Sequence, residues 1–238
     1  MKGRMVYASV PAESLQLGTV SRVGSLREQV SAALRAALIA GQLRPGIVYS
    51  APTLGEMLGV SATPVREAIL DLVREGLVEV QRNKGFRVTD LSEEQLDEFA
   101  QVRLMLEVPT MGLVASLARD SAVAANLEGL RPGAEGIVRA AAASDLVRFI
   151  ELDTEFHAHF LSLAGNSEVV RIVRDLRNRS RLYGLEAVAR AGILGRSAEE
   201  HSEMIDLALS GDRENLEALV ARHIGHVRNL WAGVADKP

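Results

Sequence analysis

The chain has 238 residues, no cysteine and a formal net charge of −4 at neutral pH. The lack of cysteine excludes disulfides and thiolate metal sites, and no apolar run approaches the roughly 18 residues that a membrane span requires. Residues 1–90 carry 11 Lys and Arg against 8 Asp and Glu, a net of +3, whereas residues 91–238 carry 16 against 23, a net of −7. This division favours a nucleic-acid-binding domain joined to a second domain that does not contact nucleic acid.

Residues 1–24 lack the apolar core of a signal peptide, and we expect a partly ordered arm at the start of a cytoplasmic protein. From Ser25 to Gly41, apolar residues recur at the spacing of a helix with one apolar face. A turn over 41–46, which contains glycine and proline, separates this helix from a short helix expected over 53–58. The chain up to residue 58 therefore predicts an arm followed by two helices.

The next segment, 59–68, has the pattern of a helix-turn-helix joint. Gly59 can adopt the left-handed conformation that is common at the end of a helix, and Ser61 can cap the following helix by accepting a hydrogen bond from a free backbone N–H. Pro64 suits the first turn, where a missing N–H costs little. The pattern predicts a helix over 61–75, although an ordinary helix start would show the same local signs.

Thr63 and Arg66 lie in the first turns of that helix, where they and the free N–H groups would face phosphates and base edges. Two runs of alternating polarity follow, over 77–81 and 85–89, with the basic segment 82–85 between them. This pattern predicts a β-hairpin with a basic tip. Three helices followed by such a hairpin are typical of a winged helix-turn-helix.

With these elements in order, residues 25–90 resemble the DNA-binding domain of the GntR family of bacterial transcription regulators. The resemblance rests on the segments Gly41-Gln42-Leu43-Arg44-Pro45-Gly46, Leu58-Gly59-Val60-Ser61, Thr63-Pro64-Val65-Arg66-Glu67-Ala68, Glu75-Gly76-Leu77-Val78 and Gly85-Phe86-Arg87-Val88. It implies a domain of three helices plus a β-hairpin wing that binds double-stranded operator DNA. The residues expected to contact DNA are Ser61, Thr63, Pro64, Arg66, Arg82, Lys84 and Gly85.

One position departs from the family pattern. Relatives usually carry an arginine where this chain has Ala62, and a bidentate arginine–guanine contact contributes about 1–3 kcal/mol of discrimination between bases. Its loss predicts a changed or weaker operator preference. Phosphate contacts from Arg66, Arg82, Lys84 and the helix N-terminus stay open to this chain.

After residue 90 the periodicity is helical throughout. Ser92-Glu93-Glu94-Gln95 is a capping-box pattern that opens a long helix. Amphipathic segments then follow at about 121–130, 134–143, 144–164, 167–191, 197–210 and 212–234. We therefore predict a mainly α protein, in which residues 91–238 form an all-helical bundle of six or seven helices.

All five histidines lie in this second half. Asp153 and His157 are four residues apart and so share one helix face, while His201 and His223 belong to two other predicted helices. One aspartate and three histidines suit Zn²⁺, Ni²⁺, Mn²⁺ or Co²⁺. The spacing alone is a weak signal, because a histidine on a helix more often lies at the surface or is hydrogen-bonded in the core.

Residues 92–234 resemble the FCD domain, the C-terminal ligand-binding and dimerisation domain of FadR-type GntR regulators. The matching segments are Val102-Arg103, Leu106-Glu107, Leu152-Asp153-Thr154-Glu155-Phe156-His157, Ala164-Gly165-Asn166, Glu200-His201 and His223-Ile224. The metal-binding members of that branch imply that Asp153, His157, His201 and His223 hold a divalent transition metal. Zn²⁺ ranks first for such a site, ahead of Ni²⁺ and Mn²⁺.

The same resemblance implies a small organic acid as effector. Arg103 matches the effector-facing arginine of the family and would hold a carboxylate bidentately. Its alternative role is an ion pair with Glu107 one helical turn later, worth about 0.3–0.5 kcal/mol if exposed. Asn178 and Arg177 lie on a helix that often lines the effector pocket, and we assign Asn178 as the second effector contact.

These features predict a homodimeric repressor that reads two half-sites of a palindromic operator. The organic acid would change operator affinity through the metal site and the long helix that begins after Ser92. The acid, the metal, the operator and the sign of the ligand effect stay open.

Two alternatives also stay open. One is a metal-dependent enzyme acting on a small carboxylate, for which no motif places a general base. The other is a regulator with a purely structural metal in a closed tetrahedral site.

Overall fold

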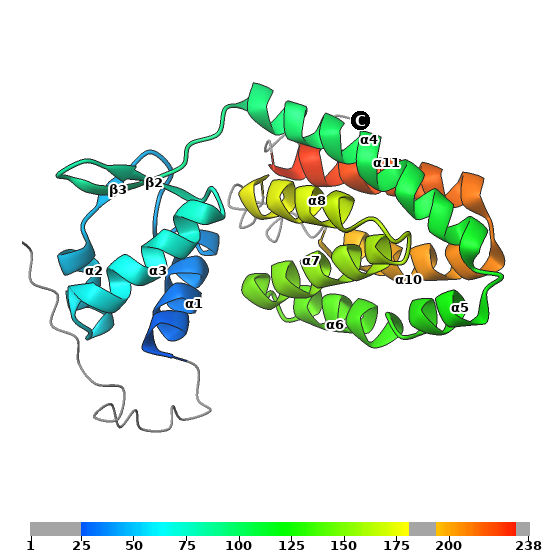
Figure 1. Cartoon of the computed structure of the whole chain (residues 1–238), viewed down its shortest axis with the longest axis horizontal. Helices are drawn as coiled ribbons and strands as arrows, with labels where there is room; N and C mark the ends of the chain where they lie inside the picture. The colour runs from blue at the N-terminus through cyan, green and yellow to red at the C-terminus, as the bar shows by residue number, and fades with distance from the viewer. Residues whose placement is uncertain (1–24, 181–193, 232–238) are drawn as a thin grey trace, which may run out of the picture.

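The computed structural model describes residues 25–180 and 194–231, and it divides them into a small N-terminal domain and a larger helical domain (Figure 1). The expected arm over 1–24 and the last part of the helix expected over 167–191 lie outside the described residues. In the described part of the chain, no helix is long and apolar enough to cross a membrane.

The N-terminal domain is a winged helix-turn-helix, as the sequence predicts. Its elements are α1 (Leu26–Ile39), β1 (Val48–Tyr49), α2 (Ala51–Leu58), α3 (Ala62–Arg74), β2 (Val78–Gln81) and β3 (Gly85–Val88). The antiparallel sheet has the order β1-β3-β2, so the β2–β3 hairpin forms the wing and β1 pairs with β3. An apolar core that includes Leu34, Leu72 and Phe86 joins the helices to the wing.

Local signals set most of these boundaries. Gly59 ends α2 in the left-handed conformation, with φ +69°. The expected start of α2 at residue 53 was wrong, because the Ser50 side chain accepts a hydrogen bond from the Thr53 N–H and the helix begins at Ala51. Ser61 is the N-cap of α3 as expected, but its side chain makes no capping hydrogen bond.

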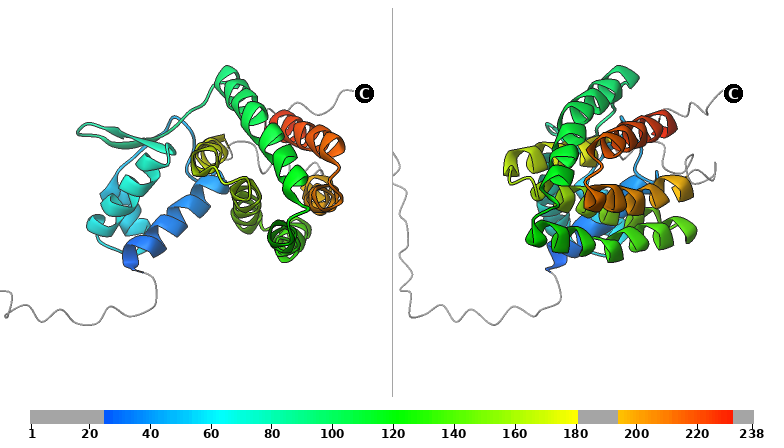
Figure 2. Two further views of the ribbon diagram at one scale, coloured as in Figure 1. Left: turned by 45° about the vertical axis from the view of Figure 1, so that its right-hand side comes forward. Right: turned by 90° about the vertical axis from the view of Figure 1, so that its right-hand side faces the viewer.

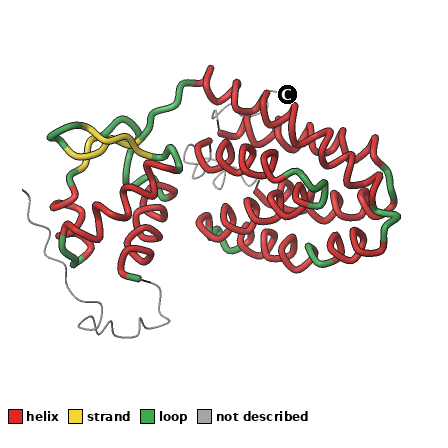
Figure 3. The backbone as a smooth tube through the Cα atoms, in the orientation of Figure 1, coloured by secondary structure: helices red, strands yellow, loops and turns green. Residues whose placement is uncertain are grey.

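The helical domain contains α4 (Glu93–Leu117), α5 (Ser121–Glu128), α6 (Arg131–Ala142), α7 (Leu146–Ser162), α8 (Ser167–Ser180), α10 (Leu194–Ser210) and α11 (Arg213–Trp231). Figure 3 shows that the described strands lie in the N-terminal domain alone. α10 begins at Leu194 rather than residue 197, and α6 begins at Arg131 with a proline in its first turn rather than at residue 134. The mainly α fold and the all-helical second domain are confirmed.

The packing of the bundle places five helices around one point. α4 packs against α11, α8, α10 and α7, while α10 also packs against α6 and α11. Figure 2 shows α4 and α11 side by side, and α7 and α8 on the side of the bundle that faces the N-terminal domain. The centre of the bundle is therefore reached by side chains from α4, α7, α8, α10 and α11.

The two domains meet where α1 packs against α7 and at the C-terminal end of α8. Arg179 lies against Gly76, the residue that turns the chain from α3 into β2 with φ +71°, and a Cβ atom at Gly76 would lie 2.9 Å from Arg179 Cδ. The Arg179 guanidinium stacks over the Phe99 ring of α4, 4.6 Å from its centroid. One side chain thus contacts the end of α3 and the start of α4.

Candidate metal centre and nucleic-acid surface

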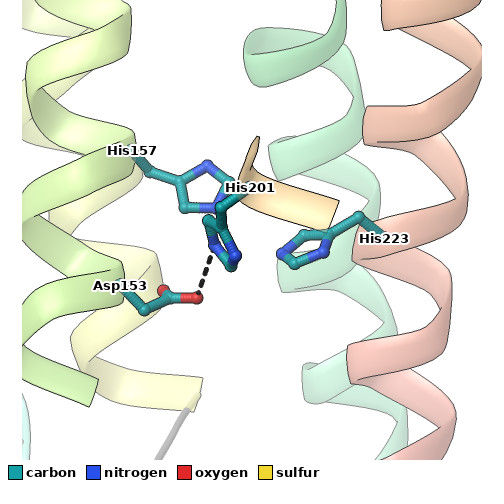
Figure 4. A group of neighbouring side chains, drawn as sticks. All are labelled: Asp153, His157, His201 and His223. Carbon is teal, nitrogen blue, oxygen red and sulfur yellow. Dashed lines mark ion pairs between the residues drawn. The ribbon is translucent and has the colours of Figure 1, made fainter. Parts of the chain in front are cut away.

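Four side chains converge in the core of the bundle (Figure 4). Asp153 and His157 come from α7, His201 from α10 and His223 from α11. One ligand atom of each residue lies within 4.8 Å of the other three, and all four residues are buried. The structure brings together the four residues that the sequence singled out as metal ligands.

The three histidines are oriented in the same way. His157 Nδ1 faces Glu107 Oε2 at 3.2 Å, His201 Nδ1 faces the Ala198 carbonyl oxygen at 3.1 Å, and His223 Nδ1 faces Glu200 Oε2 at 2.6 Å. The acceptors hydrogen-bonded to Nδ1 of His201 and His223, and the Glu107 carboxylate that faces Nδ1 of His157, favour the tautomer in which Nε2 carries a lone pair.

All three Nε2 atoms are buried and have no hydrogen-bond partner within the described residues. Buried polar atoms are nearly always hydrogen-bonded, so three such nitrogens beside the Asp153 carboxylate fit a transition metal better than packing alone. His201 Nε2 is itself only 3.2 Å from Asp153 Oδ1, the contact that Figure 4 marks.

Burial also keeps the histidines in the form that binds metal. Desolvation lowers the pKa of His157 well below its usual value, and the charge of Arg177 lowers it further. Desolvation likewise lowers the pKa of His223 to about 4, although the hydrogen bond that His223 Nδ1 donates to Glu200 opposes this shift. Both rings are therefore neutral at pH 7, and a metal would displace no proton from them.

A second layer of buried charge surrounds the histidines. Glu107 of α4 accepts a hydrogen bond from Arg103 Nε at 2.6 Å through Oε1, and its Oε2 lies 3.3 Å from Arg177 Nη2. Arg177 Nη1 donates to Asp153 Oδ2 at 3.2 Å. Burial would raise the pKa of Glu107, but the two guanidinium groups outweigh it and hold that pKa well below its usual value. Glu107 is therefore ionised and links α4 to α7 and α8.

Arg103 makes the ion pair with Glu107 that was its alternative role. The pair is almost wholly buried, so the small value of an exposed pair does not apply to it. Arg103 Nη2 is buried and has no hydrogen-bond partner within the described residues. One donor of Arg103 is thus left for a carboxylate, and its effector role stays a prediction.

Arg177, rather than the assigned Asn178, lies against the candidate metal centre. Arg177 is fully buried and contacts Asp153 and Glu107, whereas Asn178, the assigned effector contact, is only half-buried. Helical phase carries the signal, because Arg177 follows the buried Val173 by one turn and Asn178 is rotated off that face. The sequence analysis also did not assign Glu200 to the site. Glu200 and its neighbour Glu199 are the same residue type, and only the structure shows that Glu200 is buried and Glu199 exposed.

Of the seven residues expected to contact DNA, five are exposed. Ser61, Thr63 and Arg66 are exposed at the start of α3, and Arg82 and Lys84 are exposed at the tip of the wing. These five residues can reach a duplex without rearrangement of the domain.

Pro64 and Gly85 have structural explanations instead. Pro64 is buried against the core of the domain, so its side chain is not available to DNA. Gly85 has φ +125°, and a Cβ atom there would lie 2.1 Å from the Tyr49 carbonyl oxygen. The close approach of β1 to the wing therefore requires glycine at this position.

A groove of about 550 Å³ separates α3 from the wing, with Arg66, Asn83 and Lys84 among its lining residues. Two exposed cations beside this groove suit a phosphate-bearing polymer. Ala62 lies between Ser61 and Thr63 and is half-buried, so it adds little to this surface.

Two family models match consecutive parts of the chain. The model described as "Bacterial regulatory proteins, gntR family" matches residues 26–88, and the model of the FCD domain matches residues 98–226. These ranges coincide with the winged helix-turn-helix and with the helical bundle, and they confirm both resemblances noted in the sequence.

Named relatives are similar over most of the chain. The "Probable D-xylose utilization operon transcriptional repressor" of Paenarthrobacter nicotinovorans is 30% identical over 185 residues, which cover 77% of this chain and 79% of that protein. The "Nta operon transcriptional regulator" of Aminobacter aminovorans is 29% identical over 183 residues, covering 76% and 82%. The solved structure of E. coli McbR/YncC has a TM-score of 0.68 at 24% identity and covers 88% of this chain and 98% of that one. That structural likeness shows the same fold.

Proposed function

Since this chain belongs to the GntR family and carries an FCD domain, it is a DNA-binding transcription regulator, and we propose that a small organic acid bound at a metal centre of Asp153, His157, His201 and His223 controls its operator affinity. The observation that carries the proposal is the set of three buried Nε2 atoms without hydrogen-bond partners in the described residues, beside a buried carboxylate. Zn²⁺ suits this donor set first, and Ni²⁺ or Mn²⁺ suits it next.

A divalent metal held by four protein ligands can accept one or two further oxygen ligands, which a carboxylate of the acid supplies. Arg103 Nη2, a buried donor without a partner, would hold the same carboxylate. Arg177 balances the charge of Asp153 from the other side. Asn178, half-buried on the same helix, stays a weaker effector contact than either arginine.

The site is joined to the DNA-binding domain by two helices. Glu107 ties α4 to His157 and Arg177, and α4 follows the wing after a short connection. Arg179, two residues beyond Arg177 on α8, contacts Gly76 at the end of α3. The acid changes DNA affinity only to the extent that it binds the two arrangements of these helices unequally.

We further propose a cytoplasmic homodimer that represses transcription by binding two operator half-sites. The name of the Paenarthrobacter relative, a repressor, supports that sign of regulation. The net charge of +3 over residues 1–90 is modest for a DNA-binding domain. Tight binding to operator DNA therefore requires the phosphate contacts of two copies. The matched family and the relatives named above are transcription regulators, which leaves the enzyme alternative without support.

The first test is the metal content of the purified protein, measured by elemental analysis. Wild-type protein is expected to hold about one transition-metal ion per chain, and the double variant His201→Ala, His223→Ala is expected to hold none. Metal-free wild type that takes up neither Zn²⁺ nor Ni²⁺ would overturn the metal centre, while the winged helix-turn-helix would stand.

The second test concerns the acid. Operator duplexes selected from a random library are titrated by fluorescence anisotropy at one salt concentration, with and without a panel of mono-, di- and tricarboxylates. Typical coupling energies predict a change of about 5- to 150-fold in DNA affinity for one acid. Arg103→Lys keeps the positive charge beside Glu107 but loses the second donor, so this coupling should shrink, whereas the exposed Arg139→Lys should leave it unchanged.

The structural-metal alternative gives a different pattern. It expects one metal ion per chain, no open coordination position, and a DNA affinity that no carboxylate of the panel alters. That result would remove the effector from the proposal and keep the metal.

A further inference from the structure

The groove between α3 and the wing is lined mainly by apolar side chains. They come from α2, α3 and both strands of the wing: Ala51, Pro52, Ile69, Leu70, Val80 and Phe86. Pockets that bind small molecules have volumes of about 300–1,000 Å³ and combine an apolar lining with a few polar groups. The groove, at about 550 Å³, has both properties.

The apolar face of the wing continues beyond the core of its domain. Val80 on β2 lies opposite Phe86 on β3, so the two side chains share one face of the hairpin. Phe86 is buried, whereas Val80 is 62% exposed. On the α3 side of the groove, Ile69 is buried and its neighbour Leu70 is 51% exposed. Two large apolar side chains, one from α3 and one from the wing, are therefore open to solvent in one groove.

Two cations lie beside this apolar surface. Arg66 of α3 and Lys84 of the wing tip line the groove, and both are exposed. Among the residues that the structure describes, neither side chain has an ion-pair partner. Arg87 of the same wing, by contrast, pairs with Glu79. The groove thus offers an apolar surface and two unpaired positive charges, which are complementary to a negative group.

We propose that this groove binds a small organic anion with an apolar body and one negative group. The apolar body lies against Leu70, Val80 and Phe86. The negative group meets Arg66 and Lys84. DNA phosphates or an inorganic anion satisfy the two cations but leave the apolar lining uncovered, because they present only charged and polar atoms to it. An anion with an apolar body matches both parts of the lining.

Such an anion competes with DNA. Arg66 and Lys84 are also expected DNA contacts, so the anion and an operator exclude each other. Only this step rests on the proposed function, and the groove itself is independent of the metal centre. Direct competition raises the apparent dissociation constant for DNA without limit, by about elevenfold at ten times the dissociation constant of the anion. Control through the metal centre instead reaches a plateau at the coupling factor.

The first experiment uses 8-anilinonaphthalene-1-sulfonate, an aromatic anion whose fluorescence rises in apolar surroundings. Full-length protein is titrated with this probe in the presence of chelator. Val80→Trp fills the groove without a change of charge and should weaken probe binding about tenfold or more. Met57→Trp, at a methionine that is 76% exposed on α2 and does not line the groove, is the matched control and should bind the probe as wild type does.

A second experiment needs no variant. Straight-chain alkanesulfonates from propanesulfonate to octanesulfonate should displace the probe from wild-type protein, with an affinity that rises about fourfold for each added methylene. Sulfate and inorganic phosphate should not displace it at the same concentrations. At constant ionic strength, the apparent dissociation constant of an operator duplex should rise linearly with the concentration of octanesulfonate.

Three results would overturn the proposal. Displacement by sulfate or phosphate as strong as by octanesulfonate would show that the groove recognises charge alone. Probe binding that Val80→Trp leaves unchanged would place the probe elsewhere, and a plateau in DNA affinity would contradict direct competition. Failure of the metal centre or of its acid changes none of these results. A chain that bound no operator would still give the probe measurements, so the two proposals fail separately.

Discussion

The two domains place their polar residues in opposite ways. In the N-terminal domain, the side chains available to DNA are exposed on α3 and the wing, and the core is almost wholly apolar. In the helical domain, the buried polar residues include Arg103, Glu107, Asp153, Arg177, Glu200 and three histidines. Function and stability are therefore separable in the first domain and coupled in the second, because only in the second does a functional side chain also complete a buried network.

The largest expected effect comes from Glu107→Gln. The change keeps the shape of the side chain but leaves Arg103 and Arg177 buried without this negative partner, so the free energy of unfolding should fall by about 3–5 kcal/mol. The matched control is Glu135→Gln, which removes an i,i+4 pair with Arg139 at the surface and should cost under about 0.5 kcal/mol. Urea denaturation measures both, and equal losses would contradict the contrast between buried and exposed pairs.

The metal-free protein should lose stability in mild acid. The pKa of His223 is lowered from 6.5 to about 4 in the folded protein, so the unfolded chain binds more protons between these values. Its contribution to stability is present above pH 6.5 and is lost as the pH falls toward 4. Thermal unfolding of chelated protein across this range measures the effect, and the variant His223→Phe should show a shallower pH dependence.

A smaller effect is expected from Glu200→Gln. The Glu200 carboxylate accepts a hydrogen bond from His223 Nδ1 and so directs His223 Nε2 toward the proposed metal centre. Loss of such a partner typically weakens metal affinity about 10- to 100-fold. Glu199→Gln, at the exposed neighbouring position, is the control for competition titrations with a chromogenic chelator. Equal Zn²⁺ affinity of the two variants would show that Glu200 does not position the ligand.

The smallest effect on stability is expected in the wing. Lys84→Ala removes an exposed cation at the wing tip and should leave the melting temperature unchanged. DNA binding should weaken to a similar degree for all sequences, and the slope of log K against log salt should fall by about 1. Asp90→Ala, at an exposed position outside the wing tip, should not reduce that slope.

Local spacing was enough to predict the winged helix-turn-helix and most helix boundaries. Gly59 and the capping box of Ser92 and Gln95 act through hydrogen bonds within one helical turn, so residue type and spacing contain the information. The pair Asp153 and His157 was predictable for the same reason, because residues four apart share a helix face. Joining them to His201 and His223 needed the resemblance to the FCD domain.

Tertiary structure decided which side chains meet across elements. The two-residue strand β1 is too short to show alternation and exists because it pairs with β3. Arg177 shares a face of α8 with the buried Val173, but only the packing of α8 against α7 sets that face toward Asp153. Glu107 and Glu200 face the Nδ1 atoms of His157 and His223 only because α4, α7, α10 and α11 pack together. Sequence spacing specifies the face of each helix, whereas the contacts between faces depend on how all the helices pack at once.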